Sequence, residues 1–397
     1  MTGKDEVFQG FLRSDGRKGI RNVILVVYLV ECAHHVARMI VSKSGDASVQ
    51  LIGFPGCYPN SYAFRMMSRL ATHPNVGGVL LVSLGCEGFD RDGLFEDIAA
   101  SGRPVERLVI QEAGGTRSTI ASGLSAVERI RGQANAAPQV AMRVDELVVG
   151  TICGGSDGTS GITANPAVGR CFDRLIGVGA ICMFEETGEL IGCERIMAER
   201  AINPDLGKEI EAAVSKAANY YAVLGYGSFA PGNADGGLST QEEKSLGAYS
   251  KSGRSQIAGL IKPGDIPPAP GLYLMDVVPD GEVRFGFPNI SDNAEIVEMI
   301  ASGCHLILFT TGRGSVVGSA ISPVIKVCAN PETYARLAED MDIDAGRILV
   351  QTAGLDEVGD EIFALTLAVA AGLPSASESL GHQEFILTYK SFEAVGP

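Results

Sequence analysis

The sequence is poor in positive charge: Lys and Arg number 32 against 47 Asp and Glu, so the formal net charge is −15. A surface this acidic repels polyanions, so we expect neither a nucleic-acid partner nor binding to an anionic membrane surface. The longest apolar run, Val23–Val30, has eight residues, whereas a membrane-spanning helix needs about 18 or more. The first ten residues contain no apolar signal core. We therefore predict neither an export signal nor a membrane span.

Histidine is also scarce, with five residues and no metal-ligand spacing among them, which argues against a metal site built from this chain's histidines alone. No Cys-x-x-Cys pair occurs, so a zinc finger is excluded. No Gly-x-Ser-x-Gly elbow joins a strand to a helix, and no complete phosphate-binding or dinucleotide-binding glycine motif follows a strand. These absences argue against a serine hydrolase, a P-loop enzyme and a nicotinamide-dependent dehydrogenase. We expect His73, before Pro74, in a surface turn and His305 in the core.

Glycine, in contrast, is abundant, with 50 of 397 residues, against a usual share of about 7%. Apolar runs such as Val49–Gly53 and Ile181–Phe184 end in glycine-rich loops and alternate with helical stretches. Continuous apolar strands alternating with helices are typical of parallel sheets covered on both faces. We therefore predict an α/β fold of two domains, with mainly parallel, Rossmann-like sheets flanked by helices. The unpatterned stretch 132–138 indicates a division into residues 1–140 and 141–397.

Nine cysteines are an odd number scattered through a long chain, which suits reduced thiols and a cytoplasmic location better than a disulfide framework. Three of them, Cys57, Cys86 and Cys153, follow predicted strands in glycine-flanked turns. Ligands gather at the carboxyl ends of strands in open α/β sheets, and thiolates from three loops suit Fe²⁺ or an iron–sulfur cluster. The alternative is that each cysteine is a small apolar filler under its turn. We expect the other six cysteines, including Cys32, in the core.

The segment from Cys153 to Thr163 is too rich in glycine and hydroxyl groups for an ordinary loop. Its backbone N–H groups and the hydroxyls of Ser156, Thr159 and Ser160 suit a carboxylate or a polyol, and Asp157 suits a metal ligand or a base. The alternative is a structured turn.

A second glycine-rich turn offers a cation for an anionic substrate. Arg313, beside Thr311, can hold a carboxylate with two hydrogen bonds. Glu185, Glu186 and Glu189 follow the predicted strand that ends at Phe184. One of these carboxylates fits a general base or a metal ligand, and an ordinary solvated loop is the alternative.

Taken together, these motifs resemble the altronate/galactarate dehydratase family. The resemblance covers nearly the whole chain and rests on Gly10–Asn22, Leu84–Glu87, Gly114–Arg117, Cys153–Pro166, Pro231–Leu238, Glu243–Gly247 and Thr310–Ser315. It implies removal of water from sugar acids to give 2-keto-3-deoxy acids, with dependence on iron or a similar divalent metal such as Mn²⁺ or Mg²⁺. Where altronate enzymes of the family have Gly-Cys-Gly-Met, this chain has Gly-Cys-Tyr-Pro around Cys57.

The resemblance also implies a partner. Family members that act alone often carry a further amino-terminal module with a histidine-bearing loop, and here the family motif starts at Gly10. We therefore expect a separate small subunit that supplies this loop, as in the two-subunit sulfolactate sulfo-lyases of the same superfamily, and a homo-oligomer of the larger chain.

Elimination from a 2-hydroxy acid needs a base, a Lewis acid and donors that hold the carboxylate. We assign the metal to Cys57, Cys86 and Cys153, and proton transfer to Glu186, Asp157 or Lys244. We assign substrate binding to Arg313, Ser156, Thr159, Ser160 and Thr311. A histidine from the partner is an alternative base. Two other functions stay open: a sulfo-lyase that releases sulfite from 3-sulfolactate, and a non-catalytic subunit that binds a sugar acid.

Overall fold

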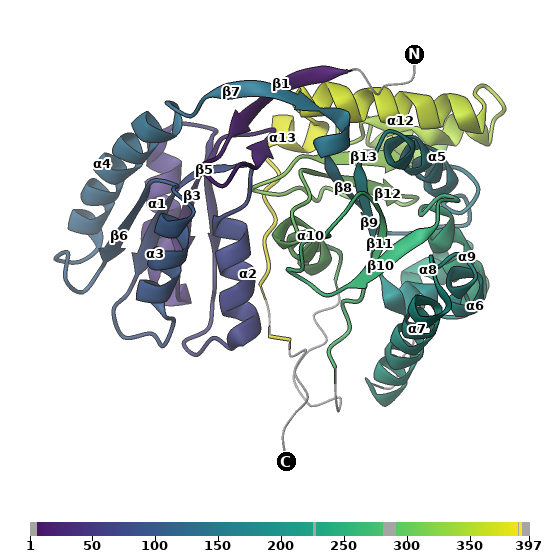
Figure 1. The fold of residues 1–397 in the computed structure, drawn as a ribbon, viewed down its shortest axis with the longest axis horizontal. Coiled ribbons are helices and arrows are strands. Elements are labelled where there is room, and N and C mark those ends of the chain that lie inside the picture. Colours follow the sequence, from purple (N-terminus) through teal and green to yellow (C-terminus); the bar gives the residue numbers. More distant parts are fainter. Residues whose placement is uncertain (1–5, 225–227, 281–290, 388, 391–397) are drawn as a thin grey trace.

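The computed structural model describes residues 6–224, 228–280, 291–387 and 389–390. It confirms the predicted α/β fold, with two parallel sheets flanked by helices and a small antiparallel sheet between them (Figure 1). Across the described residues, no helix is both long enough and apolar enough to cross a membrane.

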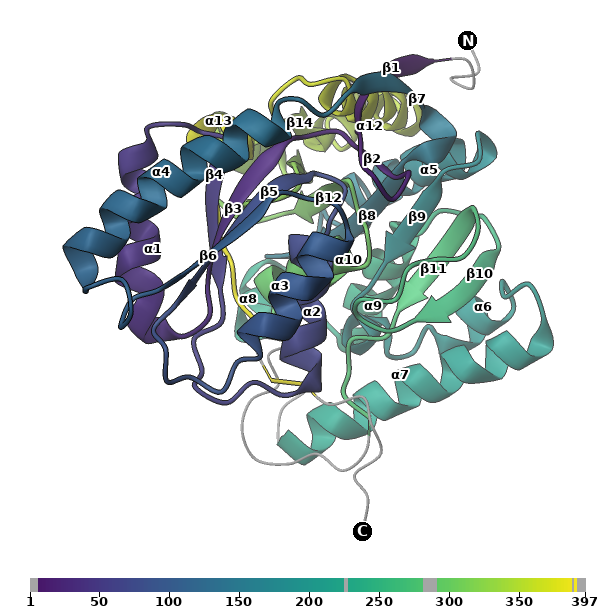
Figure 2. The same cartoon turned by 60° about the vertical axis from the view of Figure 1, so that its left-hand side comes forward.

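The amino-terminal half is built on a four-stranded parallel sheet of order β4-β3-β5-β6. Its strands are β3 (Val23–Tyr28), β4 (Val49–Gly53), β5 (Val76–Ser83) and β6 (Val105–Val109). Helices cover both faces, and all residues of β5 are buried in consequence (Figure 2). One face carries α1 (Glu31–Ser44) and α4 (Thr116–Ala134), and the other α2 (Ser61–Ala71) and α3 (Arg91–Ala100).

The carboxy-terminal half holds a seven-stranded parallel sheet of order β10-β11-β9-β8-β12-β13-β14. Its strands are β8 (Val148–Cys153), β9 (Ile181–Phe184), β10 (Ile257–Ile261), β11 (Gly271–Met275), β12 (Leu306–Thr311), β13 (Val324–Cys328) and β14 (Ile343–Asp344). The strand order reverses at β8, because β9 pairs with one of its edges and the much later β12 with the other. Ligands of open α/β sheets bind at the carboxyl ends of strands beside such a reversal.

Helices cover both faces of this second sheet. On one face α5 (Ala164–Gly177) packs against α12 (Leu355–Ala370), and on the other α10 (Asp292–Ala301) contacts both β8 and α2. One hydrophobic cluster, with Met66 of α2 and Met299 of α10, therefore continues from one half of the chain into the other. The remaining helices are α6 (Glu194–Ala198), α7 (Pro204–Leu224), α8 (Pro231–Asp235), α9 (Gln241–Ser250), α11 (Pro331–Arg336) and α13 (Ala376–Leu380), with 3₁₀ turns at Val144–Glu146, Thr187–Leu190 and Ala345–Ile348.

The two halves are joined through the small antiparallel sheet of β1 (Val7–Leu12), β2 (Lys18–Gly19) and β7 (Gln139–Arg143). The predicted boundary at residue 140 lies inside β7, which pairs along its length with β1. The stretch 132–138 is less irregular than its composition suggests, because α4 continues to residue 134. The assignment of residues 1–140 and 141–397 to separate domains stays a prediction.

Candidate active site

A cavity of about 720 Å³ opens beside the strand-order reversal. Its walls come from the loops after β8, β9 and β12, from the region around α8, and from residues of α7, α9 and α10. The charged side chains in these walls are Glu186, Glu189, Lys244, Asp292, Glu295 and Arg313. Sequence analysis selects the charged residues other than Asp292 and Glu295, although it names Glu189 only as one of several acids after a strand.

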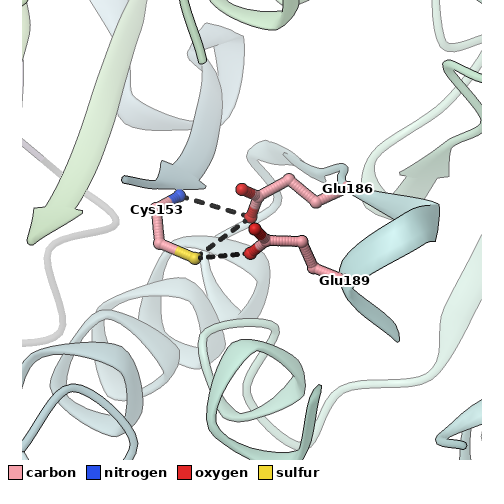
Figure 3. Close-up of side chains that lie close together, drawn as sticks. All are labelled: Cys153, Glu186 and Glu189. Atoms are coloured by element: carbon pink, nitrogen blue, oxygen red, sulfur yellow. Dashed lines mark hydrogen bonds between the residues drawn. The ribbon is translucent and has the colours of Figure 1, made fainter. Parts of the chain in front are cut away.

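Cys153 and two glutamates form a compact group in which the glutamates line the cavity and Cys153 lies buried behind them (Figure 3). The Cys153 Sγ lies 3.2 Å from Oε2 of Glu186 and 3.3 Å from Oε2 of Glu189. The backbone N–H of Cys153 donates to the same Glu186 oxygen at 3.3 Å. Cys153 ends β8 and the glutamates follow β9, so the parallel pairing of these strands brings the three residues together. Sequence analysis predicts roles for Cys153 and Glu186 and names Glu189 only as one of several acids after the strand.

Two buried lysines balance the negative charge of this group. Lys251 forms an ion pair with Glu186, and its Nζ lies 3.2 Å from the Cys153 Sγ. Lys244 forms an ion pair with Glu189. Burial by itself lowers the pKa of Lys244, but the Glu189 carboxylate outweighs this effect and the net pKa is raised. Lys244 is therefore a protonated donor rather than a base.

The Cys153 side chain is a thiol at neutral pH. Burial raises its pKa to about 11, although the ammonium of Lys251 acts in the opposite direction. The sulfur therefore donates a hydrogen bond to the carboxylates beside it. Only a bound metal ion, which replaces the proton, would turn this thiol into a thiolate ligand.

Glu186 has an unusual backbone conformation, with φ of 80° and ψ of 48°. Residues other than glycine rarely adopt this left-handed region, and such strain persists where the surrounding structure enforces it, often at functional sites. The turn allows two consecutive carboxylates, Glu185 and Glu186, to be buried at 0% and 3% exposure.

The first turn of α10 brings two acids that the sequence analysis misses. Burial, reinforced by the charge of Glu189, raises the pKa of Asp292 to about 6. Burial likewise raises the pKa of Glu295 to about 8. A Cβ atom on Gly154 would meet the Asp292 carboxylate, so glycine at this position permits the close approach. No motif marks these acids, because a helix remote in sequence carries them to the cavity.

The glycine-rich segment after β8 contains one lining residue and several supporting ones. Ser156 lines the cavity. The Oδ1 of Asp157 accepts hydrogen bonds from Oγ1 of Thr159 at 2.6 Å and Oγ of Ser160 at 3.2 Å, and its Oδ2 accepts one from Asn330 at 3.0 Å. This geometry favours a positioning role for Asp157, Thr159 and Ser160, which together hold the loop.

The turn after β12 presents Arg313 at the mouth of the cavity. Arg313 is exposed and donates one hydrogen bond to the backbone oxygen of Gly232. Thr311 is buried, and its Oγ1 accepts a hydrogen bond from the Gly314 N–H at 3.0 Å. Thr311 therefore shapes the turn, and Arg313 has donors left for a ligand.

Cys57 and Cys86 lie on exposed loops after β4 and β5 of the first sheet. Those loops touch, since the N–H of Gly88 donates to the Cys57 oxygen at 2.8 Å. Over the described residues, two groups of three side chains place metal-binding atoms within 4.8 Å of one another: Cys153 with Glu186 and Glu189, and Glu185 with Glu186 and Glu295. Cys57 and Cys86 belong to neither group, and their role as ligands stays a prediction.

The fold and the cavity define an α/β protein that gathers acidic and basic side chains beside the strand-order reversal of its larger sheet. The chain belongs to the altronate/galactarate dehydratase family. Residues 10–135 match the second domain of D-galactarate dehydratase/altronate hydrolase, and residues 144–392 match the C-terminal domain of D-galactarate/altronate dehydratase.

Three relatives show the range of the family. A (2R)-sulfolactate sulfo-lyase subunit beta of Chromohalobacter salexigens is 33% identical, with 98% of each chain aligned. An altronate dehydratase of Bacillus subtilis is 30% identical over 94% of this chain and 75% of its own. A galactarate dehydratase (L-threo-forming) of Escherichia coli is 32% identical over 92% of this chain and 73% of its own. These matches confirm the predicted enzyme class, a lyase, and support a hydro-lyase.

Proposed function

We propose that the chain is a metal-dependent hydro-lyase that removes water from a sugar acid of altronate or galactarate type to give a 2-keto-3-deoxy acid. One observation carries the proposal: Asp292 and Lys244, whose surroundings favour opposite roles in proton transfer, line the same cavity with Arg313 at its mouth. Pairs of titratable groups whose surroundings set their pKa values far apart are typical of acid–base catalysts. Relatives that act on altronate and on galactarate support the same reaction.

Each step of the elimination has a group in the cavity. Arg313 and Ser156 bind the substrate carboxylate. Asp292 takes the proton from C2, next to that carboxylate, and its pKa of about 6 suits a base at neutral pH. Lys244 donates a proton to the hydroxyl that leaves C3. The resulting enol takes a proton at C3, loses the proton of its C2 hydroxyl and becomes the 2-keto acid.

Glu186 and Asp157 support these groups rather than move the substrate's protons. Glu186 is engaged by Lys251 and Cys153, and the Asp157 carboxylate is satisfied within its own loop. Thr159, Ser160 and Thr311 hold the two loops in shape.

Iron fits the group of Cys153, Glu186 and Glu189. One sulfur and two carboxylates, close together and buried, form a donor set that suits Fe²⁺, with Mn²⁺ as an alternative. When bound there, the metal would supply a Lewis acid that stabilises the enediolate formed from the substrate. Sequence analysis adds Cys57 and Cys86 as ligands of iron or of an iron–sulfur cluster, and their serine variants test that assignment separately.

A small partner subunit belongs to the proposal. The dehydratase relatives extend beyond the aligned region, whereas the sulfo-lyase relative, which aligns over 98% of its length, is named as a subunit. We propose that a separate subunit contributes a histidine-bearing loop to the cavity and that the larger chain forms a homo-oligomer. The nine cysteines, all unpaired, support the predicted cytoplasmic location.

The full-length match to a sulfo-lyase subunit favours a second candidate, release of sulfite from 3-sulfolactate. Both reactions begin with removal of the C2 proton, and they differ in the leaving group. Incubation of the iron-loaded protein with altronate, galactarate and 3-sulfolactate, with assays for 2-keto acid and for sulfite, separates them. A 2-keto acid from a sugar acid supports the hydro-lyase, and sulfite from 3-sulfolactate supports the second candidate. Binding of a sugar acid without either product would point to a non-catalytic subunit.

A further inference from the structure

The carboxylate of Glu185 is fully buried, and within the described part of the chain neither of its oxygens has a hydrogen-bond partner. Glu295, on α10, is 2% exposed, and its Oε1 lacks a partner in the same region. Buried carboxylates in proteins are almost always paired with a cation or coordinated to a metal ion. We therefore expect a cation or a metal ion beside each of these two carboxylates.

The lysines around them are already engaged. Lys251 forms an ion pair with Glu186, and Lys390 lies 2.7 Å from Oε1 of Glu298, one helical turn beyond Glu295 on α10. Both pairs are almost fully buried. The charge of Lys251 reaches Glu185 and that of Lys390 reaches Glu295, but among the described residues neither lysine forms an ion pair with these two acids.

We propose that Glu185, Glu186 and Glu295 bind a divalent cation that prefers oxygen ligands, of the Mg²⁺ or Mn²⁺ type. One oxygen from each residue lies within 4.8 Å of the other two, a spacing that one ion can bridge with metal–oxygen distances of about 2.0–2.2 Å. The carboxylates come from the end of β9 and from α10, two elements that the core holds rigidly. This site is distinct from the group with Cys153, whose sulfur suits a softer metal.

The two groups meet at Glu186. Figure 3 shows one oxygen of Glu186 directed at Cys153 and the other pointing away from it. Glu186 thus connects the proposed cation to the cavity wall, while Lys251 remains on the oxygen that faces Cys153. Cation binding does not depend on the proposed reaction, because it can be measured without substrate.

A proton is the competing occupant. Burial disfavours the charged form of both carboxylates, so protons compete with the cation for the oxygens of Glu185 and Glu295. A glutamine, which resembles a protonated glutamic acid in shape and charge, is therefore the informative substitution: it keeps the protonated form and removes the ligand.

Titration of chelator-treated protein with Mn²⁺, followed by electron paramagnetic resonance, tests the site. We expect wild type to bind Mn²⁺, and Glu185→Gln and Glu295→Gln each to weaken binding roughly tenfold or more. Asp344→Asn is the matched control, because it changes a carboxylate of β14, outside the group, whose Oδ1 is buried and lacks a hydrogen-bond partner among the described residues, and it should bind Mn²⁺ like wild type. Cys153→Ser should also keep this Mn²⁺ site.

Circular dichroism and thermal melting verify that each variant is folded. Without metal, Glu185→Gln should melt at least as high as wild type, since it replaces a buried acid with a neutral amide. No Mn²⁺ binding by folded wild type would overturn the proposal, as would unchanged binding in both Glu185→Gln and Glu295→Gln. If wild type binds Mn²⁺ but does not turn over a sugar acid, the proposed reaction is contradicted and the proposed cation site is not.

Discussion

The ammonium nitrogen of Lys251 lies 3.2 Å from the sulfur of Cys153, with both side chains buried. The lysine also pairs with Glu186, so one cation touches both a predicted metal ligand and the strained residue opposite it. Buried ion pairs leave an uncompensated charge when one partner is removed. Any function proposed for Cys153 and Glu186 therefore has to include Lys251.

Replacement of Lys251 by Met should strongly destabilise the fold. The change leaves Glu186 buried without its cation, and loss of one partner of a buried pair typically costs about 3–5 kcal/mol. The free energy of unfolding, measured with urea, checks this value. The double variant with Glu186→Gln should recover much of the loss, because it removes the stranded charge. If the single variant is as stable as wild type, the ion pair does not form in solution.

Replacement of Cys153 by Ser should remove bound iron. The thiol and its two carboxylates are the proposed ligands, and loss of the sulfur leaves a harder and weaker donor set. Iron and acid-labile sulfide in anaerobically purified protein are the measurements. Cys57→Ser and Cys86→Ser, analysed in parallel, decide whether the first sheet also contributes ligands. Iron retained by Cys153→Ser would show that the metal binds outside this group.

Replacement of Gly154 by Ala should lower kcat and cost some stability in a protein that still folds. The new methyl group meets both the Asp292 carboxylate and the ring of the buried Phe309, so the carboxylate must move away from its place in the cavity. Gly177→Ala is the matched control, because nothing lies near that position in α5. The control should keep full activity and gain up to about 1 kcal/mol of stability from the better helix former. Equal activity of the two variants would argue against a role for Asp292.

The part of the stability that depends on His305 and His73 should fall as the pH drops from about 6.5 toward 4, whereas the raised pKa values of Asp292 and Glu295 act in the opposite direction. Burial lowers the pKa of His305 to about 4 and that of the adjacent His73 as well. In that window the unfolded chain binds protons that the folded state excludes, so stability present above pH 6.5 is lost on acidification. The contribution of His305 alone amounts to about 3 kcal/mol.

Urea unfolding at several pH values measures this loss. His305→Asn keeps an acceptor for the backbone N–H of Val148, which donates to the histidine at 3.0 Å in wild type. The variant should lose less stability than wild type between pH 6.5 and 4. Identical pH dependence of the two proteins would show that His305 does not titrate in this way.

The sequence predicts the strands of this fold better than the surroundings of its side chains. Val49–Gly53 and Ile181–Phe184 are observed as predicted, because fully buried parallel strands are continuous apolar runs. The strand β13 was not predicted in this way, because the buried Lys326 interrupts its apolar run. The expectation that His73 lies in a surface turn is wrong, because packing between the two halves buries its ring at 1% exposure. The expectation that Cys32 lies in the core is also wrong, since it is exposed at the start of α1.

Some residues of the candidate site could likewise be predicted from the sequence, and others could not. Cys153 and Arg313 were predictable, because the residues at the carboxyl ends of strands converge in a parallel sheet. Asp292 and Glu295 were not, because a helix remote in sequence brings them to the cavity. Lys251 was not predictable either, since it follows α9 and is buried beside Cys153 without a local pattern that marks it. Long-range packing, rather than local sequence, determines which acids are buried next to one another.

The measurement that tests the account most directly compares Asp292→Asn with wild type on galactarate and altronate, using iron-loaded protein of verified metal content together with the proposed small subunit. Asparagine preserves the shape of the side chain and removes the base. We predict that wild type forms a 2-keto acid and that the variant, with unchanged iron, is slower by about 10²- to 10⁴-fold in kcat. Turnover by Asp292→Asn within a few-fold of wild type would contradict the assignment of elimination chemistry to this cavity.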